Sequence, residues 1–324
     1  MNYTITATLG PASAVPPLWA AMRDAGATAF RLNTSHLAPD DLAGWLARLD
    51  AFRRESGADW SVVLDLQGSK WRLGQFPARL LAPGERLRLL HADSSPAQSV
   101  LPVPHADFFR AALASTGEVL LDDAKIALRV EFVDAESAVA VVVRGGEIRP
   151  RKGITLNGGE VRSEEINPRD RAVIEVSAEY SFVEYAISYV RDAQEMARYR
   201  ALFPPAARLI AKLERESAMQ AAEQIAAHAG SLWVCRGDLG MELGIPRMAA
   251  AVHQITAAVR SIPVPVVMAG QVFEHLVAHP EPTRSEVCFL YDCLQAGYAG
   301  VILSDECAVG QYPVEAVRAA ALFR

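Results

Sequence analysis

Leu209-Ile-Ala-Lys-Leu-Glu214 and Val234-Cys-Arg-Gly-Asp-Leu-Gly240 are the two stretches that decide how this chain folds. Each begins as an apolar run and ends in charge, with Glu214 closing the first and Asp238 near the end of the second. In a parallel α/β sheet, buried strands are continuous apolar runs and functional groups collect where the strands end. Two carboxylates beside a lysine suit Mg²⁺, which takes oxygen ligands and shares its shell with substrate. Solvated charges are the alternative, but Gly237, where backbone N–H groups can reach a ligand, favours a site.

Composition narrows the class of protein. The chain has 324 residues, 51% of them hydrophobic, and a formal net charge of −6. This length can bury one large core, and α/β barrels often form a single domain of such size. The acidic balance argues against a nucleic-acid partner. The sequence begins without a basic segment followed by an apolar one, and no uncharged apolar run is long enough to span a membrane. We therefore expect a cytoplasmic protein without a membrane partner.

Apolar runs and helical patterns alternate along most of the chain. Strands are predicted at residues 3–9, 28–32, 60–66, 185–190, from 209, from 232, at 264–268 and at 300–303. The alternation breaks between residues 73 and 157, where short alternating runs separated by Pro and Gly predict a small all-β insertion. Eight strand–helix units predict a (β/α)₈ barrel with active residues at the carboxyl ends of its strands. The barrel domain would comprise residues 1–72 and 158–324, and the inserted lid residues 73–157.

The common phosphate-binding fingerprints are missing. The sequence contains neither GxxxxGK[ST] nor GxGxxG, so a phosphate would have to be bound by cationic side chains and backbone amides. One arginine at a strand end is usually a structural ion pair, but many on one rim favour an anionic ligand. The candidates are Arg31, Lys70, Arg72, Lys152, Arg191, Lys212 and Arg236.

These motifs together resemble the pyruvate kinase family, over essentially the whole chain. The segments that carry the resemblance are Thr8-Leu-Gly-Pro-Ala-Ser13, Arg31-Leu-Asn-Thr-Ser-His36, Leu120-Leu-Asp-Asp123, Lys152-Gly-Ile-Thr-Leu-Asn-Gly158, Ile210-Ala-Lys-Leu-Glu214, Arg236-Gly-Asp-Leu-Gly240, Pro282-Thr-Arg-Ser-Glu286 and Gly310-Gln-Tyr-Pro-Val-Glu-Ala-Val317. The resemblance implies a glycolytic kinase that converts phosphoenolpyruvate and ADP to pyruvate and ATP with Mg²⁺ or Mn²⁺. Phosphoryl transfer of this kind depends on positioning and on charge stabilisation by metal, Lys and Arg.

The resemblance also implies roles for individual residues. Catalytic roles fall on Lys212, Arg31 and Glu306, and metal binding on Glu214 and Asp238. Substrate contacts are implied for Gly237, Asp238, Gly270 and Ser188. Nucleotide contacts are implied for Arg72, Lys152, Asn33 and Pro11, with the insertion, including Asp123, closing as a lid. The monovalent-cation site of the family, or its substitute, maps to Asn33, Ser35, Asp65 and Lys70.

The chain departs from the family pattern in four places. Asp65-Leu-Gln-Gly-Ser-Lys70 stands where the family has Asp-Thr-Lys-Gly-Pro-Glu, and a branch with lysine there works without potassium, so K⁺ should not be required. Ala269-Gly-Gln-Val272 lacks the threonine of Ala-Thr-Gln-Met, which removes a hydroxyl and enlarges the pocket. Ser304-Asp-Glu-Cys307 replaces Ser-Gly-Glu-Thr. Finally, the chain ends at Arg324, so we expect the family's C-terminal regulatory domain and its effector regulation to be absent.

Three functions therefore stay open. The first is the kinase reaction on phosphoenolpyruvate, and a variant of it is phosphoryl transfer from another enol acid. The second is a metal-dependent enolate enzyme such as an aldolase or lyase, because a metal and Arg31 would also stabilise an enolate. The third is a ligand-binding homologue without turnover. The sequence leaves the nucleotide preference and a homo-oligomer open.

Overall fold

A computed structural model describes residues 1–57, 59–115, 117–122, 124–156 and 166–324. The chain forms two compact units. The first comprises Met1–Gly68, Ile166–Gly237 and Met248–Arg324, and the second comprises Ser69–Glu165 and Asp238–Arg247. The expected boundaries are 72/73 and 157/158, whereas the first segment of the barrel unit ends at Gly68, four residues earlier. Residues 157–165, which include Asn157 and Gly158 of the resemblance, lie outside the described residues.

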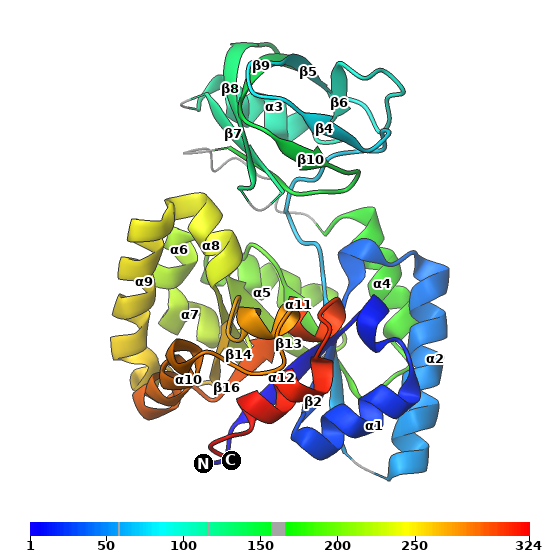
Figure 1. Ribbon diagram of the computed structural model, residues 1–324, viewed down its shortest axis with the longest axis vertical. Helices are drawn as coiled ribbons and strands as arrows, with labels where there is room; N and C mark the ends of the chain where they lie inside the picture. Colours follow the sequence, from blue (N-terminus) through cyan, green and yellow to red (C-terminus); the bar gives the residue numbers. More distant parts are fainter. Residues whose placement is uncertain (58, 116, 123, 157–165) are drawn as a thin grey trace. The chain divides into compact units, whose positions relative to one another are not determined.

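The first unit contains a closed barrel of eight parallel strands, as the alternation of apolar runs predicts (Figure 1). Around the barrel the strands follow the order β1, β2, β3, β12, β13, β14, β15 and β16, and β16 pairs again with β1. Their bounds are β1 (Thr4–Leu9), β2 (Ala29–Asn33), β3 (Ser61–Asp65), β12 (Val183–Ile187), β13 (Arg208–Leu213), β14 (Ser231–Cys235), β15 (Val266–Ala269) and β16 (Gly300–Leu303). The insertion follows β3, as predicted.

Helices connect successive barrel strands and surround them in Figure 1. They are α1 (Pro16–Ala25), α2 (Pro39–Ser56), α4 (Pro168–Ser177), α5 (Ala193–Leu202), α6 (Glu216–Gln220), α7 (Ala222–Ala226), α8 (Arg236–Leu243), α9 (Ile245–Ala258), α10 (Arg284–Ala296), α11 (Asp305–Ala308) and α12 (Pro313–Ala320), with short 3₁₀ turns at Pro11–Ser13, Thr34–His36, Val259–Ser261 and Glu274–Val277. Two of these, α8 and α11, were not predicted. Asp238 of α8, and Asp305 and Glu306 of α11, belong to first helical turns, where a carboxylate is favourable near the positive end of the helix dipole.

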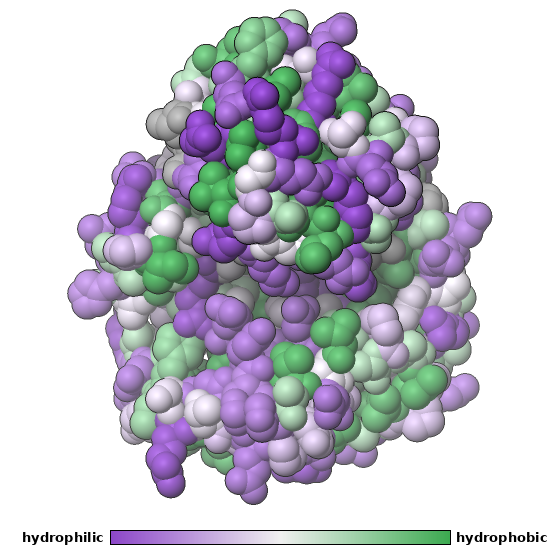
Figure 2. Space-filling model, turned by 45° about the horizontal axis from the view of Figure 1, so that its top comes forward, coloured by the Kyte–Doolittle hydropathy of each residue, from purple (hydrophilic) through white to green (hydrophobic). Residues whose placement is uncertain are grey.

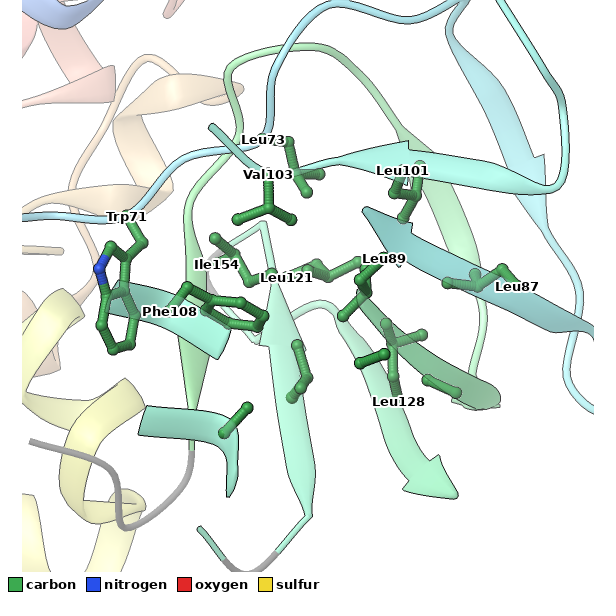
Figure 3. Close-up of a cluster of buried hydrophobic side chains, with 14 of the residues drawn as sticks. Trp71, Leu73, Leu87, Leu89, Leu101, Val103, Phe108, Leu121, Leu128 and Ile154 are labelled. Atoms are coloured by element: carbon green, nitrogen blue, oxygen red, sulfur yellow. The ribbon is translucent and has the colours of Figure 1, made fainter. Parts of the chain in front are cut away.

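The second unit is mainly β. Its range from Ser69 onward includes a helix that the sequence pattern did not predict, α3 (Ala106–Leu113), and Asp238–Arg247 adds parts of α8 and α9. A six-stranded sheet has the order β11-β7-β8-β9-β5-β6, and β4 pairs separately with β10. The bounds are β4 (Arg79–Leu81), β5 (Arg86–Leu90), β6 (Val100–Pro102), β7 (Glu118–Leu121), β8 (Ile126–Val133), β9 (Ser137–Arg144), β10 (Gly146–Ile148) and β11 (Ile154–Leu156). Figure 3 shows its buried cluster, in which Trp71 meets Phe108 edge to face with ring centroids 5.3 Å apart.

Side chains from every second position of the strands fill the barrel interior. Val63, Ala186, Ile210, Trp233, Cys235, Val267, Ala269 and Ile302 form one buried cluster contributed by β3 and β12–β16. Because successive side chains of a strand point to opposite faces, positions two residues apart share the interior. On the face drawn in Figure 2, hydrophilic and hydrophobic residues are interspersed. Among the helices formed by the described residues, none is both long and apolar enough to cross a membrane.

Candidate active site

The polar site begins where the apolar filling of the barrel ends. Asp65 lies two positions after the interior residue Val63, and Lys212 lies two positions after Ile210. The pleat therefore directs both side chains to the interior at the carboxyl end of their strands. Both are buried, at 3% and 8% exposure. Functional residues are expected at this end of the barrel, and the structure brings several of the predicted ones together there.

Asp65 is the centre of this group. One of its oxygens, Oδ2, accepts a hydrogen bond from Nε of Arg31 at 2.8 Å, and the other, Oδ1, lies 3.0 Å from Nζ of Lys212. Arg31 comes from the neighbouring strand β2, and its Nη1 donates to Oγ1 of Thr8 on β1 at 2.8 Å. The Arg31 guanidinium is thus held from two sides. Three adjacent strands fix the direction in which this cation points.

Lys212 joins Asp65 to a second carboxylate. Its Nζ donates to Oγ of Ser188 at 2.9 Å and lies 2.8 Å from Oε1 of Glu214. The other Glu214 oxygen, Oε2, accepts the backbone N–H of Tyr189 at 2.7 Å. Glu214 is fully buried, which would be unfavourable for a carboxylate without such partners. A buried lysine flanked by two carboxylates is the result.

The charges in this group support one another. Burial alone would raise the pKa of Asp65, but the charges of Lys212 and Arg31 outweigh it and hold that pKa below its ordinary range. Burial alone would lower the pKa of Arg31. The negative charge of Asp65 and the hydrogen bonds to it act against burial, so the pKa of Arg31 is raised. Asp65 stays ionised and Arg31 stays charged, as a site for an anionic phosphate group requires.

Three residues predicted to bind a nucleotide or a cation lie in the turns that follow β1 and β2. Pro11 is exposed and opens the 3₁₀ turn after β1. Asn33 caps the next 3₁₀ turn, because its Oδ1 accepts the backbone N–H of Ser35 at 3.2 Å. Ser35 itself is buried at 3% exposure. Asn33 and Ser35 thus belong to one turn, and their role in a monovalent-cation site stays a prediction.

Gly270 has a backbone conformation that a side chain would strain. Its φ is +88°, in the left-handed region, and the φ of the following Gln271 is also positive at 54°. Arg236 holds this turn by donating Nε to the carbonyl oxygen of Gly270 at 2.9 Å, and it stacks over the Phe289 ring at 4.3 Å. A Cβ at position 270 would lie only 3.1 Å from the backbone nitrogen of Gly237. Glycine thus leaves the space beside that amide open.

Glu306 is fully buried and engaged with the backbone. Its Oε1 accepts the N–H of Phe273 at 3.0 Å, and its Oε2 accepts the N–H of Ser304 at 2.6 Å. Burial raises its pKa, against the lowering effect of these donors. These contacts tie the turn after β15 to the turn after β16. They describe an anchoring group, and a catalytic role for Glu306 stays a prediction.

The second unit contains the remaining predicted residues. Lys70 forms an ion pair with Asp238, and the Nζ of Lys152 lies 2.8 Å from Oδ1 of Asp122. Arg72 donates from Nη1 to the carbonyl oxygen of Arg151 at 2.8 Å. Asp123, which the resemblance also invoked, lies outside the described residues.

The predicted metal ligands fit a hard cation in chemical type. Glu214 belongs to the barrel unit and Asp238 to the second unit, and each supplies carboxylate oxygens. No cluster of three or more His, Cys, Asp or Glu side chains suited to a metal occurs within the described parts of the chain. Mg²⁺ commonly uses only one or two protein carboxylates and keeps water and phosphate oxygens, so either carboxylate is suitable as a ligand by its chemistry.

Sequence reasoning missed two residues of the barrel site, Thr8 and Asp170. Thr8 could have been found from the pairing of β1 with β2, which places it opposite Arg31, but the register is not visible in the sequence. Asp170 follows Asn167 and Pro168 in a pattern typical of a helix start. That pattern predicts the helix, and it carries no sign that the Asp170 carboxylate reaches the segment after β3.

Comparison with known proteins agrees with this architecture. The family model for the pyruvate kinase barrel domain matches residues 1–317. Pyruvate kinase of Agrobacterium vitis is 34% identical over 317 residues, covering 97% of this chain and 66% of the relative. Pyruvate kinase of Methylorubrum extorquens is 33% identical over 316 residues, with coverage of 97% and 66%. The chain thus spans slightly less than two thirds of the length of these curated relatives.

A solved structure supports the fold. A pyruvate kinase from Cryptosporidium parvum superposes with a TM-score of 0.84 over 99% of this chain and 68% of that one, at 23% sequence identity. At this identity the likeness establishes the fold alone. The family follows from the barrel-domain match across nearly all of the sequence and from relatives at one-third identity. This chain belongs to the pyruvate kinase family.

Proposed function

We propose that this protein transfers the phosphoryl group of phosphoenolpyruvate to ADP, forming pyruvate and ATP. The P–O bond to the enol oxygen breaks, a P–O bond to the β-phosphate of ADP forms, and the enolate takes up a proton to become pyruvate. The observation that carries the proposal is the buried group of Arg31, Asp65, Lys212 and Glu214 at the carboxyl end of the barrel strands. The proposed reaction is the one after which the pyruvate kinase family is named, and membership of that family supports it.

In this proposal Arg31 and Lys212 act on the phosphoryl group. Arg31 grips the phosphate, and Lys212 neutralises the charge that moves to the phosphoryl oxygens in the transition state. Both cations are anchored on Asp65, so little reorganisation is needed when the anion arrives. The side chain of Ser188 and the backbone amides of Gly237 and Asp238 contact the substrate.

Glu214 and Asp238 would hold Mg²⁺ or Mn²⁺. When bound, the metal would supply positive charge that stabilises the negative charge of the phosphoryl group. Each carboxylate has a cationic neighbour, Lys212 beside Glu214 and Lys70 beside Asp238. Arg72, Lys152, Asn33 and Pro11 would contact the nucleotide. A cytoplasmic location is part of the proposal.

Potassium independence is also proposed, on the strength of Lys70. Its side chain is 11% exposed and its ammonium already pairs with the Asp238 carboxylate, so a positive charge is built into the chain. Asn33, Ser35 and Asp65 are the other residues at the family's monovalent-cation position. Substitution of Lys70→Glu should make activity depend on K⁺, whereas the wild type should turn over equally well with Na⁺ or K⁺.

A second function deserves a test because of Gly270. The open space beside the Gly237 amide could accept a larger 2-oxo acid, and a metal-dependent enolate enzyme would use the same carboxylates. Lys152→Met separates the two, because it should damage a kinase and leave an aldolase or lyase almost unaffected. A phosphotransferase acting on another enol acid would lose activity with this variant, like the kinase.

The deciding experiment is pyruvate formation from phosphoenolpyruvate and ADP with Mg²⁺, coupled to lactate dehydrogenase, with and without K⁺. We expect turnover in both conditions, and its loss in Lys212→Met, which keeps the length of the side chain and removes the charge. Binding of phosphoenolpyruvate without pyruvate would contradict the proposal and indicate another enol substrate or a ligand-binding protein.

A further inference from the structure

The segment Leu66–Gly68, which follows Asp65 and leads out of the barrel unit, is held by close contacts. The Leu66 N–H donates to the carbonyl oxygen of Ala186 at 2.9 Å, and the Leu66 carbonyl oxygen accepts Oγ of Ser188 at 2.7 Å. Gly68 has a φ of +61°, and a Cβ there would collide with the carbonyl oxygen of Ser188. The segment is therefore packed against the same residue that receives a hydrogen bond from Lys212.

A buried carboxylate completes this clamp. Asp170 is 1% exposed, and its Oδ1 accepts the N–H of Gln67 at 2.9 Å. Its Oδ2 accepts the N–H of Gly68 and the side-chain amide of Asn167, both at 2.8 Å. The Asn167 amide also donates to the carbonyl oxygen of Gly68 at 3.0 Å. Asp170 thus receives three donors, two of them from a segment more than 100 residues earlier.

We propose that Asp170 is a positioning residue of the active site, which fixes the backbone two and three residues after Asp65 and so the direction of the Asp65 carboxylate. The functional part of this inference rests on the proposed kinase reaction. Asp65 orients both Arg31 and Lys212, and a misplacement of about 1 Å in such a group can cost about 100-fold in rate. Asp170 itself touches neither the reacting atoms nor the two cations.

Helix capping alone does not account for Asp170. Asn167 already caps α4, because its Oδ1 accepts the Asp170 N–H at 2.8 Å. Glu286 holds the corresponding third position of α10, and one of its oxygens closes a capping box with the N–H of Thr283. Asp170 has no such bond to its own cap backbone, and both of its oxygens serve the segment after β3. Burial raises its pKa to about 6, so holding this charge costs stability.

The test compares two substitutions that each replace a carboxylate by the amide of the same shape. Asp170→Asn keeps the shape but sets an NH₂ group against donors that the carboxylate accepted. Glu286→Gln is the matched control, because Glu286 also sits at a helix third position and accepts two backbone N–H groups, those of His275 and Thr283. Hydrogen exchange of the peptide covering residues 66–70 is measured without substrate, and kcat/KM is measured with phosphoenolpyruvate, ADP and Mg²⁺.

We expect Asp170→Asn to speed exchange in residues 66–70 and to lower kcat/KM about tenfold or more, mainly through KM, since about 1.4 kcal/mol corresponds to tenfold. Glu286→Gln should lose comparable thermal stability and keep kcat/KM within about twofold. Should Asp170→Asn fail to fold, Asn167→Ser decides the matter, because serine retains the cap and loses the amide that Asn167 donates to the Gly68 carbonyl oxygen and to the Asp170 carboxylate.

Two results would overturn the inference. One is unchanged exchange in residues 66–70 in a folded Asp170→Asn protein, and the other is an equal loss of kcat/KM in both variants. If the wild type makes no pyruvate, the proposed reaction fails, but the exchange measurement still decides whether Asp170 fixes the segment.

Discussion

Arg31 owes its direction to two neighbours of different chemistry, the Asp65 carboxylate and the Thr8 hydroxyl. Thr8→Val keeps the shape of the side chain and leaves Nη1 of Arg31 without this acceptor. A hydrogen bond to a charged group contributes about 1.5–3 kcal/mol, so kcat/KM for phosphoenolpyruvate should fall about tenfold or more. Thr8→Ser retains the hydroxyl and should keep wild-type activity. Equal activity of the valine and serine variants would show that Asp65 alone orients Arg31.

At Gly270, a substitution that restores the threonine of the family pattern is expected to destabilise the protein. Gly270→Thr places a β-branched residue at φ +88° and a Cβ near the Gly237 nitrogen, so the free energy of unfolding should fall by about 1–3 kcal/mol. Gly44 provides the control, because it is exposed within α2 and has no neighbour near its would-be Cβ. Gly44→Ala should stabilise the protein by about 0.5–1 kcal/mol in urea unfolding. A neutral Gly270→Thr would mean that the turn relaxes readily.

At the scale of elements, the start of α4 should respond to pH through Asp170. Burial raises the pKa of Asp170 to about 6, from the ordinary Asp value of 3.8, so between these values the folded protein binds the proton more tightly. Stability from this group is therefore lost as pH rises from about 4 to about 6, by on the order of 3 kcal/mol. Asp170→Asn lacks this titration.

The measurement is urea unfolding of both proteins at pH 4.5 and pH 7.5. The destabilisation caused by Asp170→Asn should be larger at pH 4.5 than at pH 7.5, because the wild type alone carries the penalty of a buried charge at the higher pH. A difference that stays constant with pH would indicate an ordinary pKa for Asp170.

Helices and strands with a clear hydrophobic period could be predicted from the sequence. Short helices without a full period, and contacts between distant segments, could not. The helices α1 and α4 each begin at a proline, which is a common first helical residue, and all eight barrel strands were located. The helices α8 and α11 are short and follow strands directly, so they lack a full helical period. The contacts of Asp170 and Thr8 depend on chain segments that only the folded barrel brings together, which a reading along the sequence cannot supply.

At the scale of the whole molecule, each unit has a core of its own. Leu89 of β5 is fully buried in the cluster shown in Figure 3, and all members of that cluster lie between Trp71 and Leu156. Ile302 of β16 belongs to the barrel cluster. Truncating a buried Leu or Ile to Ala costs about 2–5 kcal/mol. The separate cores predict that each truncation weakens the unit in which it lies.

Leu89→Ala should therefore speed hydrogen exchange in β5–β9 and leave β13–β16 protected, and Ile302→Ala should do the reverse. In the proposed reaction, Leu89→Ala should also raise the KM for ADP more than that for phosphoenolpyruvate, because Arg72 and Lys152 belong to the second unit. Exchange that accelerates equally in both units with either variant would contradict separate cores and show that the chain opens as one cooperative unit. The pattern of exchange thus decides whether the insertion can loosen while the barrel keeps Arg31, Asp65 and Lys212 in place.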